Sequence, residues 1–331
     1  DDVEKKPNAS VDDVLSHGYG SGFEINMLFY YFLQQRGLKP ELAFVADRRD
    51  KMVDSEVHEW QFDASVVLLP TRNNKYETFA PAIPDLPAGS IPYYYEGTKV
   101  LKIDSTACTW IYLPFSADRA NTIKRSLDLQ LSASAEPTGL FSEQSTGQFA
   151  WMRRSLLRNV DSLEVMESLM EELKGLAPLA EIDSIRYANP DKLDSCFIIT
   201  CKMRFPKLVR HIGRTYFLQP SNYYEFIDNP LTAEKRESPI VFGFAYDQQE
   251  TICFRPSPDW LIVSFPGNTS FPHSAGRIEM LYTEVEKVLS MQRNLRLRTI
   301  YWKASDYPLL QRYFQKRTLL NNELVVLEKK E

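Results

Sequence analysis

One segment of the sequence, from Gly18 to Gly37, specifies a helix and so constrains what the rest of the chain can fold into. It reads GYGSGFEINMLFYYFLQQRG. Its apolar side chains recur at intervals of three and four, at Ile25, Leu28, Phe29, Phe32 and Leu33. This spacing places them along one side of an α-helix, which predicts that this side is buried against other parts of the protein.

Both ends of this predicted helix carry recognisable signals. Ser21 precedes Glu24 by three residues, the spacing of a capping box in which each residue satisfies a backbone N–H of the other. The helix is therefore expected to start near residue 22, where the helix dipole also favours the Glu24 carboxylate. At the other end Gly37 can adopt the left-handed backbone conformation, and Pro40 prevents continuation.

The segment also resembles a known enzyme family. GYGSGFEINMLFYYFLQQRGLKPELAFVADRR strongly resembles the core of bacterial transglutaminase-like proteins, whose fold is papain-like, that is, cysteine-protease-like. In that family a GYG-x-C-x-D/E turn opens the helix, whose N-terminus stabilises the cysteine as a thiolate. When the two are aligned on Gly20 and Glu24, the family cysteine falls on Gly22.

The other two members of the family's Cys-His-Asp triad also fall on residues without a reactive group. The histidine stands in an F-N/D-H-V-x-V context, which FDASVVLLP matches with Ala64 in the histidine position. The acid closes a Y-x-L-D-P/A-T run, which YETFAPA matches with Ala80 in the acid position. The resemblance therefore implies a degenerate core in which Gly22, Ala64 and Ala80 are vestigial triad positions and no residue is catalytic.

Substituted catalytic residues are the alternative. Ser21 could replace the nucleophile, although its place in a capping box already explains it. His58, in the segment HEW, is similar to the H-A-W of active relatives but lies too far from the next strand. Asp63 or Asp104 could orient it, although an aspartate near a strand end is more often a turn residue. This alternative is an acyltransferase or hydrolase that uses Ser21 and His58.

The region up to residue 118 reads as the remainder of the core, with few residues ahead of the helix. Because other family members have further helices there, the core is expected to be N-terminally truncated. Four prolines between residues 81 and 92 exclude a regular helix or central strand and predict an ordered loop or lid. The candidate lining of the old cleft is Ser21, Glu24, His58, Trp60, Tyr93 and Tyr95, although consecutive tyrosines more often pack against neighbours.

Residues 119–331 are predicted to form a β-rich domain, similar to the domain that follows the core in the same family. IKRSLDLQLSAS alternates as a half-buried strand, and further strands are expected near 195–204, 214–218, 239–246 and 250–255. One helix is predicted from a cap at Asp161, and a second from about Tyr307, capped by Ser305. The fold class is thus α+β: a truncated transglutaminase-like core at 1–118 and a β-sandwich-like domain with one or two packed helices.

Composition excludes several classes of function. A net charge of −5 argues against nucleic-acid binding, which needs a clustered positive surface. No apolar run is long enough to span a membrane, and the sequence as given shows no signal peptide. The four cysteines form no C-x-x-C pair and have no histidine at ligand spacing, so free thiols are expected rather than a metal site. No phosphate-binding or dinucleotide motif is present, so no cofactor is predicted.

The resemblance implies a bacterial protein in the periplasm or another extracytoplasmic compartment. With the triad lost, it implies a binding or structural role at the cell envelope. The expected ligand is a peptide, a glycan or a protein, held in the old cleft between the helix at 22–36 and the strand from residue 62. A cleft filled by side chains would instead indicate a purely architectural domain. The oligomeric state is not specified by the sequence.

Overall fold

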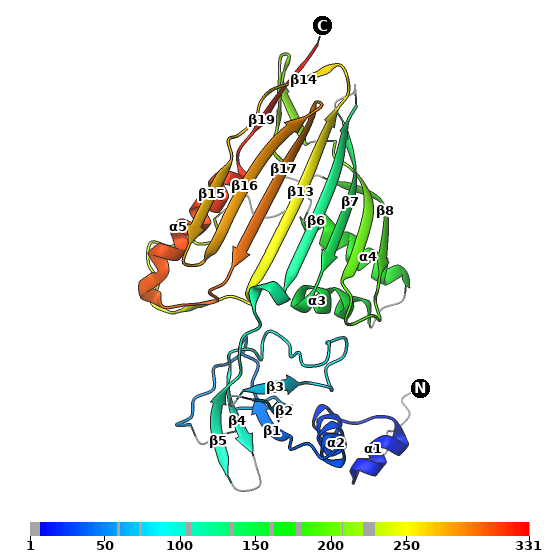
Figure 1. The fold of residues 1–331 in the computed structure, drawn as a ribbon, viewed down its shortest axis with the longest axis vertical. Helices are drawn as coiled ribbons and strands as arrows, with labels where there is room; N and C mark the ends of the chain where they lie inside the picture. The colour runs from blue at the N-terminus through cyan, green and yellow to red at the C-terminus, as the bar shows by residue number, and fades with distance from the viewer. Residues whose placement is uncertain are drawn as a thin grey trace. The chain divides into compact units, whose positions relative to one another are not determined.

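The computed structural model describes residues 7–330 except 58–59, 73–74, 104–106, 133–135, 159–161, 177–179, 207 and 221–228. The chain divides into two compact units, Asp1–Ser116 and Ala117–Glu331, shown as ribbons in Figure 1. The fold is mixed α+β and rich in strands, as predicted for the class. Among the described residues, no helix has both the length and the apolar composition needed to cross a lipid bilayer.

The first unit begins with two capped helices, α1 (Val11–His17) and α2 (Gly22–Gln35). The predicted start of α2 is confirmed, because the Glu24 backbone N–H donates to Ser21 Oγ at 3.3 Å and the Ser21 N–H donates to Glu24 Oε2 at 2.6 Å. The end is confirmed too, since Gly37 adopts a left-handed conformation with φ of 74°.

A five-stranded antiparallel sheet in the order β3-β2-β1-β4-β5 forms the body of this unit. Its strands are β1 (Glu41–Val45), β2 (Ala64–Pro70), β3 (Tyr76–Phe79), β4 (Lys99–Ile103) and β5 (Cys108–Tyr112). One face is the core, where Ala43, Val45, Val66 and Leu68 meet side chains of the proline-containing connection such as Ile91. The connection from 80 to 98 is irregular but ordered, as its prolines predict.

Helix α2 packs against the other face of the sheet. Asn26 donates to the backbone oxygen of Ser65 on β2, and the ring of Phe29 lies 5.3 Å from that of Phe79 on β3. The predicted buried face of α2 is only partly formed, however. Within the described structure the one fully buried side chain of α2 is Asn26, whereas Phe32 is 44% exposed. The expectation of a buried face is wrong for Phe32 because α2 packs mainly against β2 and α1 and leaves this side chain uncovered.

The second unit is built on an eight-stranded sheet in the order β15-β16-β17-β13-β6-β7-β9-β8, antiparallel except between β13 and β6. The strands are β6 (Thr122–Leu131), β7 (Pro137–Ser145), β8 (Glu181–Ala188), β9 (Phe197–Arg204), β13 (Tyr246–Pro256), β15 (Thr269–His273), β16 (Gly276–Val285) and β17 (Val288–Leu297). The 3-10 turn η1 (Asp118–Ala120) precedes β6.

Two smaller sheets complete this unit. One has the order β10-β11-β19-β14, with bounds Val209–Ile212, Thr215–Leu218, Val325–Lys329 and Trp260–Ser264, and the other pairs β12 (Ile240–Val241) with β18 (Tyr301–Trp302). Leu218, Trp260 and Leu327 of the four-stranded sheet belong to the same apolar core as Phe254 and Met291 of the eight-stranded sheet. The two sheets therefore share one core.

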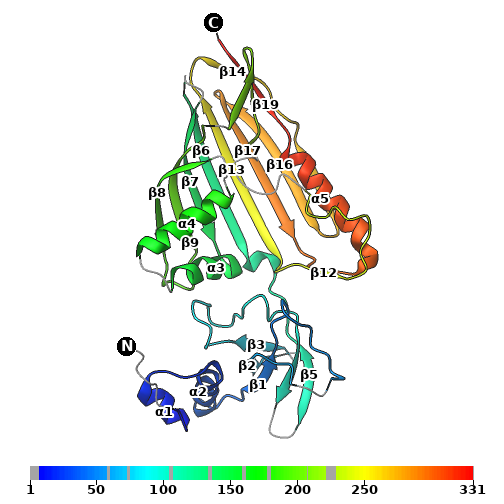
Figure 2. The same cartoon turned by 180° about the vertical axis from the view of Figure 1, so that it is seen from behind.

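Helices α3 (Gly147–Leu157), α4 (Ser162–Leu176) and α5 (Tyr307–Asn321) lie over one face of the eight-stranded sheet, in front of it in Figure 2. The prediction of one or two helices is therefore wrong. Helix α3 was not predicted, because its buried side chains include Gln148, Arg153 and Arg154, and these polar residues weaken the apolar periodicity of the segment.

Two details of the predicted helix ends also change. The N-cap of α5 is Asp306 without a side-chain cap, because the 3-10 turn η3 (Ala304–Asp306) precedes the helix and Ser305 Oγ donates to Asp306 instead. The predicted cap at Asp161 lies outside the described residues. The expected strand at 239–246 is reduced to Ile240–Val241, and β13 starts at Tyr246.

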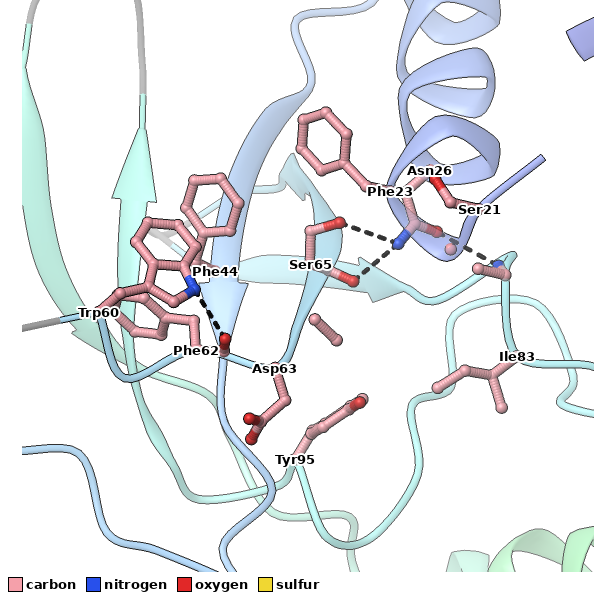
Figure 3. Close-up of a pocket in the computed structure, with 13 residues that line it drawn as sticks. Ser21, Phe23, Asn26, Phe44, Trp60, Phe62, Asp63, Ser65, Ile83 and Tyr95 are labelled. Carbon is pink, nitrogen blue, oxygen red and sulfur yellow. Dashed lines mark hydrogen bonds between the residues drawn. The ribbon is translucent and has the colours of Figure 1, made fainter. Parts of the chain in front are cut away.

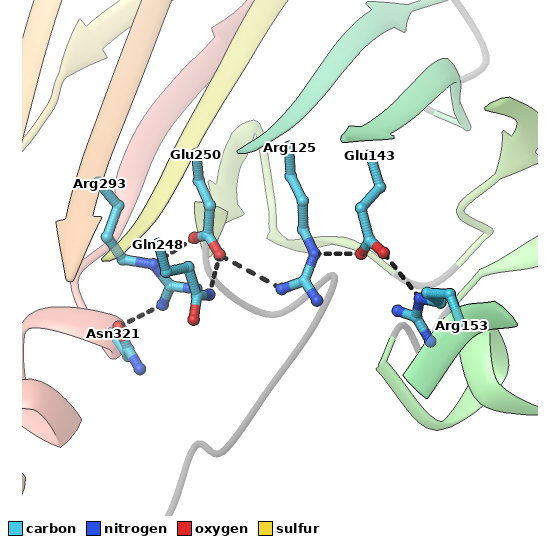
Figure 4. A network of polar contacts seen from close by, with 7 residues as sticks. All are labelled: Arg125, Glu143, Arg153, Gln248, Glu250, Arg293 and Asn321. Atoms are coloured by element: carbon cyan, nitrogen blue, oxygen red, sulfur yellow. Dashed lines mark hydrogen bonds and ion pairs between the residues drawn. The ribbon is translucent and has the colours of Figure 1, made fainter. Parts of the chain in front are cut away.

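A chain of buried charges crosses the covered face of the eight-stranded sheet (Figure 4). The strand register places Glu250 directly opposite Arg293 and Arg125, and Arg125 directly opposite Glu143. Arg125 Nε donates to Glu143 at 2.7 Å, and Arg153 Nε of α3 donates to the other oxygen of Glu143 at 2.9 Å. Charges of alternating sign thus face each other across β17, β13, β6 and β7, a favourable cross-strand arrangement.

The ends of this chain join the sheet to its helices. Arg293 pairs with Glu250, and its Nη1 donates to Asn321 Oδ1 of α5 at 2.6 Å. Gln248 Nε2 also donates to Glu250. Because Arg153 belongs to α3 and Asn321 to α5, the buried polar chain fixes both helices on the sheet.

Candidate functional site

The first unit contains an open pocket of about 610 Å³ at the N-terminus of α2 (Figure 3). The N-cap Ser21 and Gly22, Phe23 and Asn26 of helix α2 form one part of the lining. The sheet and the segment leading into β2 contribute Phe44, Trp60, Phe62, Asp63, Ala64 and Ser65. Ala82, Ile83 and Tyr95 of the proline-containing connection complete the lining.

Asn26 fixes the geometry of this pocket. It lies one helical turn after Gly22 on the same side of α2, and it is buried. Its amide nitrogen donates to Ser65 O at 2.8 Å and to Ser65 Oγ at 3.1 Å, while its Oδ1 accepts from the Ala82 N–H at 3.2 Å. One side chain therefore holds the helix, the strand and the connection in place around the pocket.

Aromatic rings form one wall. Phe44 lies 6.1 Å from Phe23 in a stacked arrangement and 4.9 Å from Trp60 edge-on, and Phe62 lies 5.2 Å from Trp60. The indole N–H of Trp60 donates to Phe62 O at 2.8 Å, yet Trp60 remains 68% exposed. Its polar atom is satisfied, so what it offers to a ligand is an apolar surface.

Two polar side chains at the rim of the pocket, Asp63 and Tyr95, differ in their hydrogen bonds. Asp63 accepts from Lys51 Nζ at 2.8 Å and from the Asp47 N–H at 3.1 Å, so its charge is paired. Tyr95 is only 7% exposed, and burial raises the pKa of its hydroxyl, which keeps the group protonated. In Figure 3 this hydroxyl ends on the pocket side, between Asp63 and Ile83.

The structure brings some of the predicted site residues together. Gly22, Ala64, Ser21, Trp60 and Tyr95 all line the pocket. A Cβ added at Gly22 would lie 3.7 Å from the Cβ of Ala82, so a side chain at Gly22 would face the proline-containing connection.

Other predicted site residues lie elsewhere. Ala80 is buried in the core and does not line the pocket, where Ala82 takes its place. Glu24 serves the capping box and accepts from Asn8, and its pKa is lowered mainly by the Ser21 backbone hydrogen bond. Tyr93 belongs to a separate cluster in which its carbonyl accepts from Arg48 and its ring lies under Arg49. His58 and Asp104 lie outside the described residues.

No histidine occurs among the described residues that line the pocket. Ser21 Oγ accepts the Glu24 N–H, as a helix cap does. The described lining therefore contains no hydroxyl or thiol beside an imidazole, the pair that nucleophilic catalysis requires. Across the described part of the chain, the cysteines are free and no cluster of histidine, cysteine and carboxylate side chains could hold a metal ion.

Sequence reasoning missed several residues of the pocket, chiefly Asn26, Phe44 and Ser65. Asn26 had a detectable signal, since it is polar beside the apolar stripe of the helix and four residues after Gly22. Phe44 alternates with the core residues Ala43 and Val45 and so points to the opposite face of the sheet. Ser65 becomes recognisable only when its contact with Asn26, from a distant segment, is known.

Comparison with known proteins finds similar proteins but identifies no function for this chain. The family model of a domain of unknown function with a solved structure, DUF3858, matches residues 213–327, which lie in the second unit. Comparison with curated proteins finds no match. A solved structure described as "a putative protease from Parabacteroides distasonis ATCC 8503" is similar, with a TM-score of 0.49 and 13% identity. The match covers 97% of this chain and 46% of that protein, so the chain spans about half its length. The transglutaminase-like core stays a prediction.

Proposed function

We propose that the first unit is a non-catalytic, transglutaminase-like core that binds a ligand in the pocket at the N-terminus of α2. The observation that carries this proposal is the open pocket of about 610 Å³, lined by Gly22 and Ala64. These are the positions where the family resemblance puts the nucleophile and the base. With side chains no larger than a methyl group at both positions, the space that catalytic groups would fill is left for a ligand.

The construction of the pocket supports binding over a filled, architectural core. Ligand sites are typically concave, largely apolar and furnished with a few fixed polar groups. Here the aromatic wall supplies the apolar surface, and Asn26 fixes the three surrounding elements. A location at the bacterial cell envelope, and a domain boundary near residue 118, are part of the same proposal through the family resemblance.

The alternative, hydrolysis or acyl transfer by Ser21, has less support. Its hydroxyl and backbone are both engaged in the capping box. A nucleophile also needs a base within about 3 Å to remove its proton. No described residue of the pocket lining supplies an imidazole for that role.

Blocking the pocket tests the proposal. Blocked dipeptides and N-acetylated disaccharides would be titrated into the whole chain while tryptophan fluorescence and backbone amide NMR shifts are recorded. At least one probe should bind saturably and shift the amides of α2's first turn. Gly22→Trp, whose side chain would face Ala82, should abolish that binding.

Tyr31→Trp is the matched control, because Tyr31 is an exposed residue of the same helix that does not line the pocket. It should leave the affinity unchanged. Binding that survives Gly22→Trp would place the ligand elsewhere and overturn the proposal. Turnover of an amide probe that disappears in Ser21→Ala would establish the enzyme alternative instead.

A further inference from the structure

We infer that the pocket recognises an apolar carboxylate, the chemistry presented by a peptide C-terminus that ends in an aromatic or large aliphatic residue, or by a free aryl carboxylic acid. This inference rests on the proposed function and specifies its ligand class. It depends on three hydrogen-bond donors of the pocket lining that have no acceptor within the described residues: the N–H groups of Gly22 and Phe23 and the hydroxyl of Tyr95.

The first donors are backbone N–H groups of α2. The first residues of a helix have no intrahelical acceptor for their N–H groups. The capping box satisfies Glu24 through Ser21 Oγ, and the Ile25 N–H donates to Ser21 O. Gly22 and Phe23 both line the pocket, and within the described residues neither N–H has an acceptor. The helix dipole adds partial positive charge at this point, which favours an anion.

An independent donor faces the same space from the proline-containing connection. Tyr95 is 7% exposed as a whole residue, and its hydroxyl has no hydrogen-bond partner within the described part of the chain. Because the group is neutral and protonated, it can donate to a ligand oxygen.

Several acceptors in the pocket already have a partner, and each oxygen of the Asp63 carboxylate accepts one hydrogen bond, from Lys51 Nζ and from the Asp47 N–H. Asn26 Oδ1 accepts from the Ala82 N–H, and Phe62 O accepts from the Trp60 indole. The Asp63 carboxylate is paired with Lys51. A carboxylate ligand can accept from several of the unpaired donors at once.

The walls specify the rest of the ligand. Phe23, Phe44, Trp60 and Phe62 present ring faces and edges, and aromatic rings pack well in edge-on and offset arrangements. A volume of about 610 Å³ lies within the usual range for small-ligand sites. A single aromatic residue with its terminal carboxylate is thus of suitable size.

The test compares N-acetyl-L-phenylalanine with its primary amide, using calorimetry on the whole chain. The carboxylate should bind at least about tenfold more tightly than the amide, since hydrogen bonds to charged groups are the stronger ones. N-acetyl-L-alanine, which has the carboxylate without the ring, should bind at least about tenfold more weakly, since it buries far less apolar area.

Two matched pairs of variants locate the donors. Gly22→Pro removes one N–H at a helix position that suits proline, and Ser21 already has the extended backbone that precedes proline, with ψ of 163°. It should weaken carboxylate binding about threefold to tenfold relative to Gly22→Ala, which keeps the N–H. Tyr95→Phe should have a similar effect, whereas Tyr112→Phe, at a 70% exposed position on β5, should have none.

The outcomes separate this inference from the proposed function. Equal affinity for the acid and the amide, or equal affinity of Gly22→Pro and Gly22→Ala for the acid, would overturn the carboxylate inference. If Gly22→Trp still abolished binding in that case, the proposed function of the pocket would stand. A third acid, 3-phenylpropanoate, identifies the source. Tighter binding than N-acetyl-L-phenylalanine supports a free aryl acid, and weaker binding supports a peptide C-terminus; both agree with the inference.

Discussion

The two units contain polar groups of two kinds, paired charges in the second and unpaired donors at a pocket in the first. In the second unit, Arg293, Glu250, Arg125 and Glu143 are nearly inaccessible and are paired with one another across adjacent strands. In the first unit, the Tyr95 hydroxyl and the first-turn N–H groups of α2 face an open pocket. Paired charges inside a core hold elements together, whereas donors directed into a pocket are available to a ligand. Inaccessible, mutually paired polar groups therefore indicate a structural role, whereas an unpaired donor directed into a pocket indicates a place for a ligand.

The largest expected effect is on the buried charge chain. Glu250→Gln should lower the free energy of unfolding of the second unit by about 3 to 5 kcal/mol, since it leaves Arg293 without its carboxylate partner and removes one of the two carboxylates that pair with Arg125. Urea denaturation followed by far-ultraviolet circular dichroism would measure it. Glu284→Gln is the control, because Glu284 is an exposed residue on β16 and should change stability by less than about 0.5 kcal/mol. A loss of stability below about 1 kcal/mol for Glu250→Gln would show that these paired buried charges contribute little to the stability of the second unit.

The pH dependence of stability tests whether Glu143 is ionised and paired in the second unit. Burial by itself would raise the pKa of Glu143, but Arg125 and Arg153 outweigh it and hold that pKa below its ordinary value of 4.5. A carboxyl group with a lowered folded-state pKa stabilises the protein fully above its unfolded pKa, and this contribution is lost as the pH falls through the folded value. The stability difference between the wild-type chain and Glu143→Gln should therefore be constant near neutral pH and shrink below about pH 4.5. A difference that stays constant down to pH 3 would contradict the lowered pKa.

In the first unit, Asn26 is the buried polar side chain with the clearest structural role. Asn26→Ala removes its bonds to Ser65 and to the Ala82 N–H and leaves these groups unsatisfied. The unfolding free energy of this unit should fall by about 1 to 3 kcal/mol. Gln34→Ala, on an exposed part of the same helix, is the control. Asn26→Ala should also weaken ligand binding, because the connection carrying Ala82 and Ile83 loses its attachment to α2.

Local signals allowed part of this structure to be predicted, and long-range pairing explains most of what was missed. The capping residues Ser21 and Glu24 and the C-terminal Gly37 act within one helix, so the bounds of α2 could be predicted closely. The buried charge chain depends on the register of β6 with β7 and with β13. Strand β13 lies more than a hundred residues after β6 in the sequence. Without that register Glu250 and Arg125 look like ordinary surface residues. The pocket was partly predictable, because the resemblance pointed to Gly22 and Ala64 and the candidate cleft lining included Tyr95, whereas the direction of the Tyr95 hydroxyl became known only from the structure.

The smallest expected effect concerns Gly22 itself. Its backbone is not left-handed, and an added Cβ would make only an ordinary contact with Ala82 at 3.7 Å. Gly22→Ala should therefore fold normally and raise the unfolding free energy of the first unit by up to about 1 kcal/mol, through the lower entropy of the unfolded chain. Thermal and urea unfolding would measure this change against Gly37→Ala, which should be destabilised because Gly37 has φ of 74°. A stable Gly22→Ala would mean that the backbone does not require glycine there, so that the contribution of Gly22 is the space it leaves in the pocket. A loss of more than about 1 kcal/mol would instead assign Gly22 a structural role and remove one reason for treating the pocket as a ligand site.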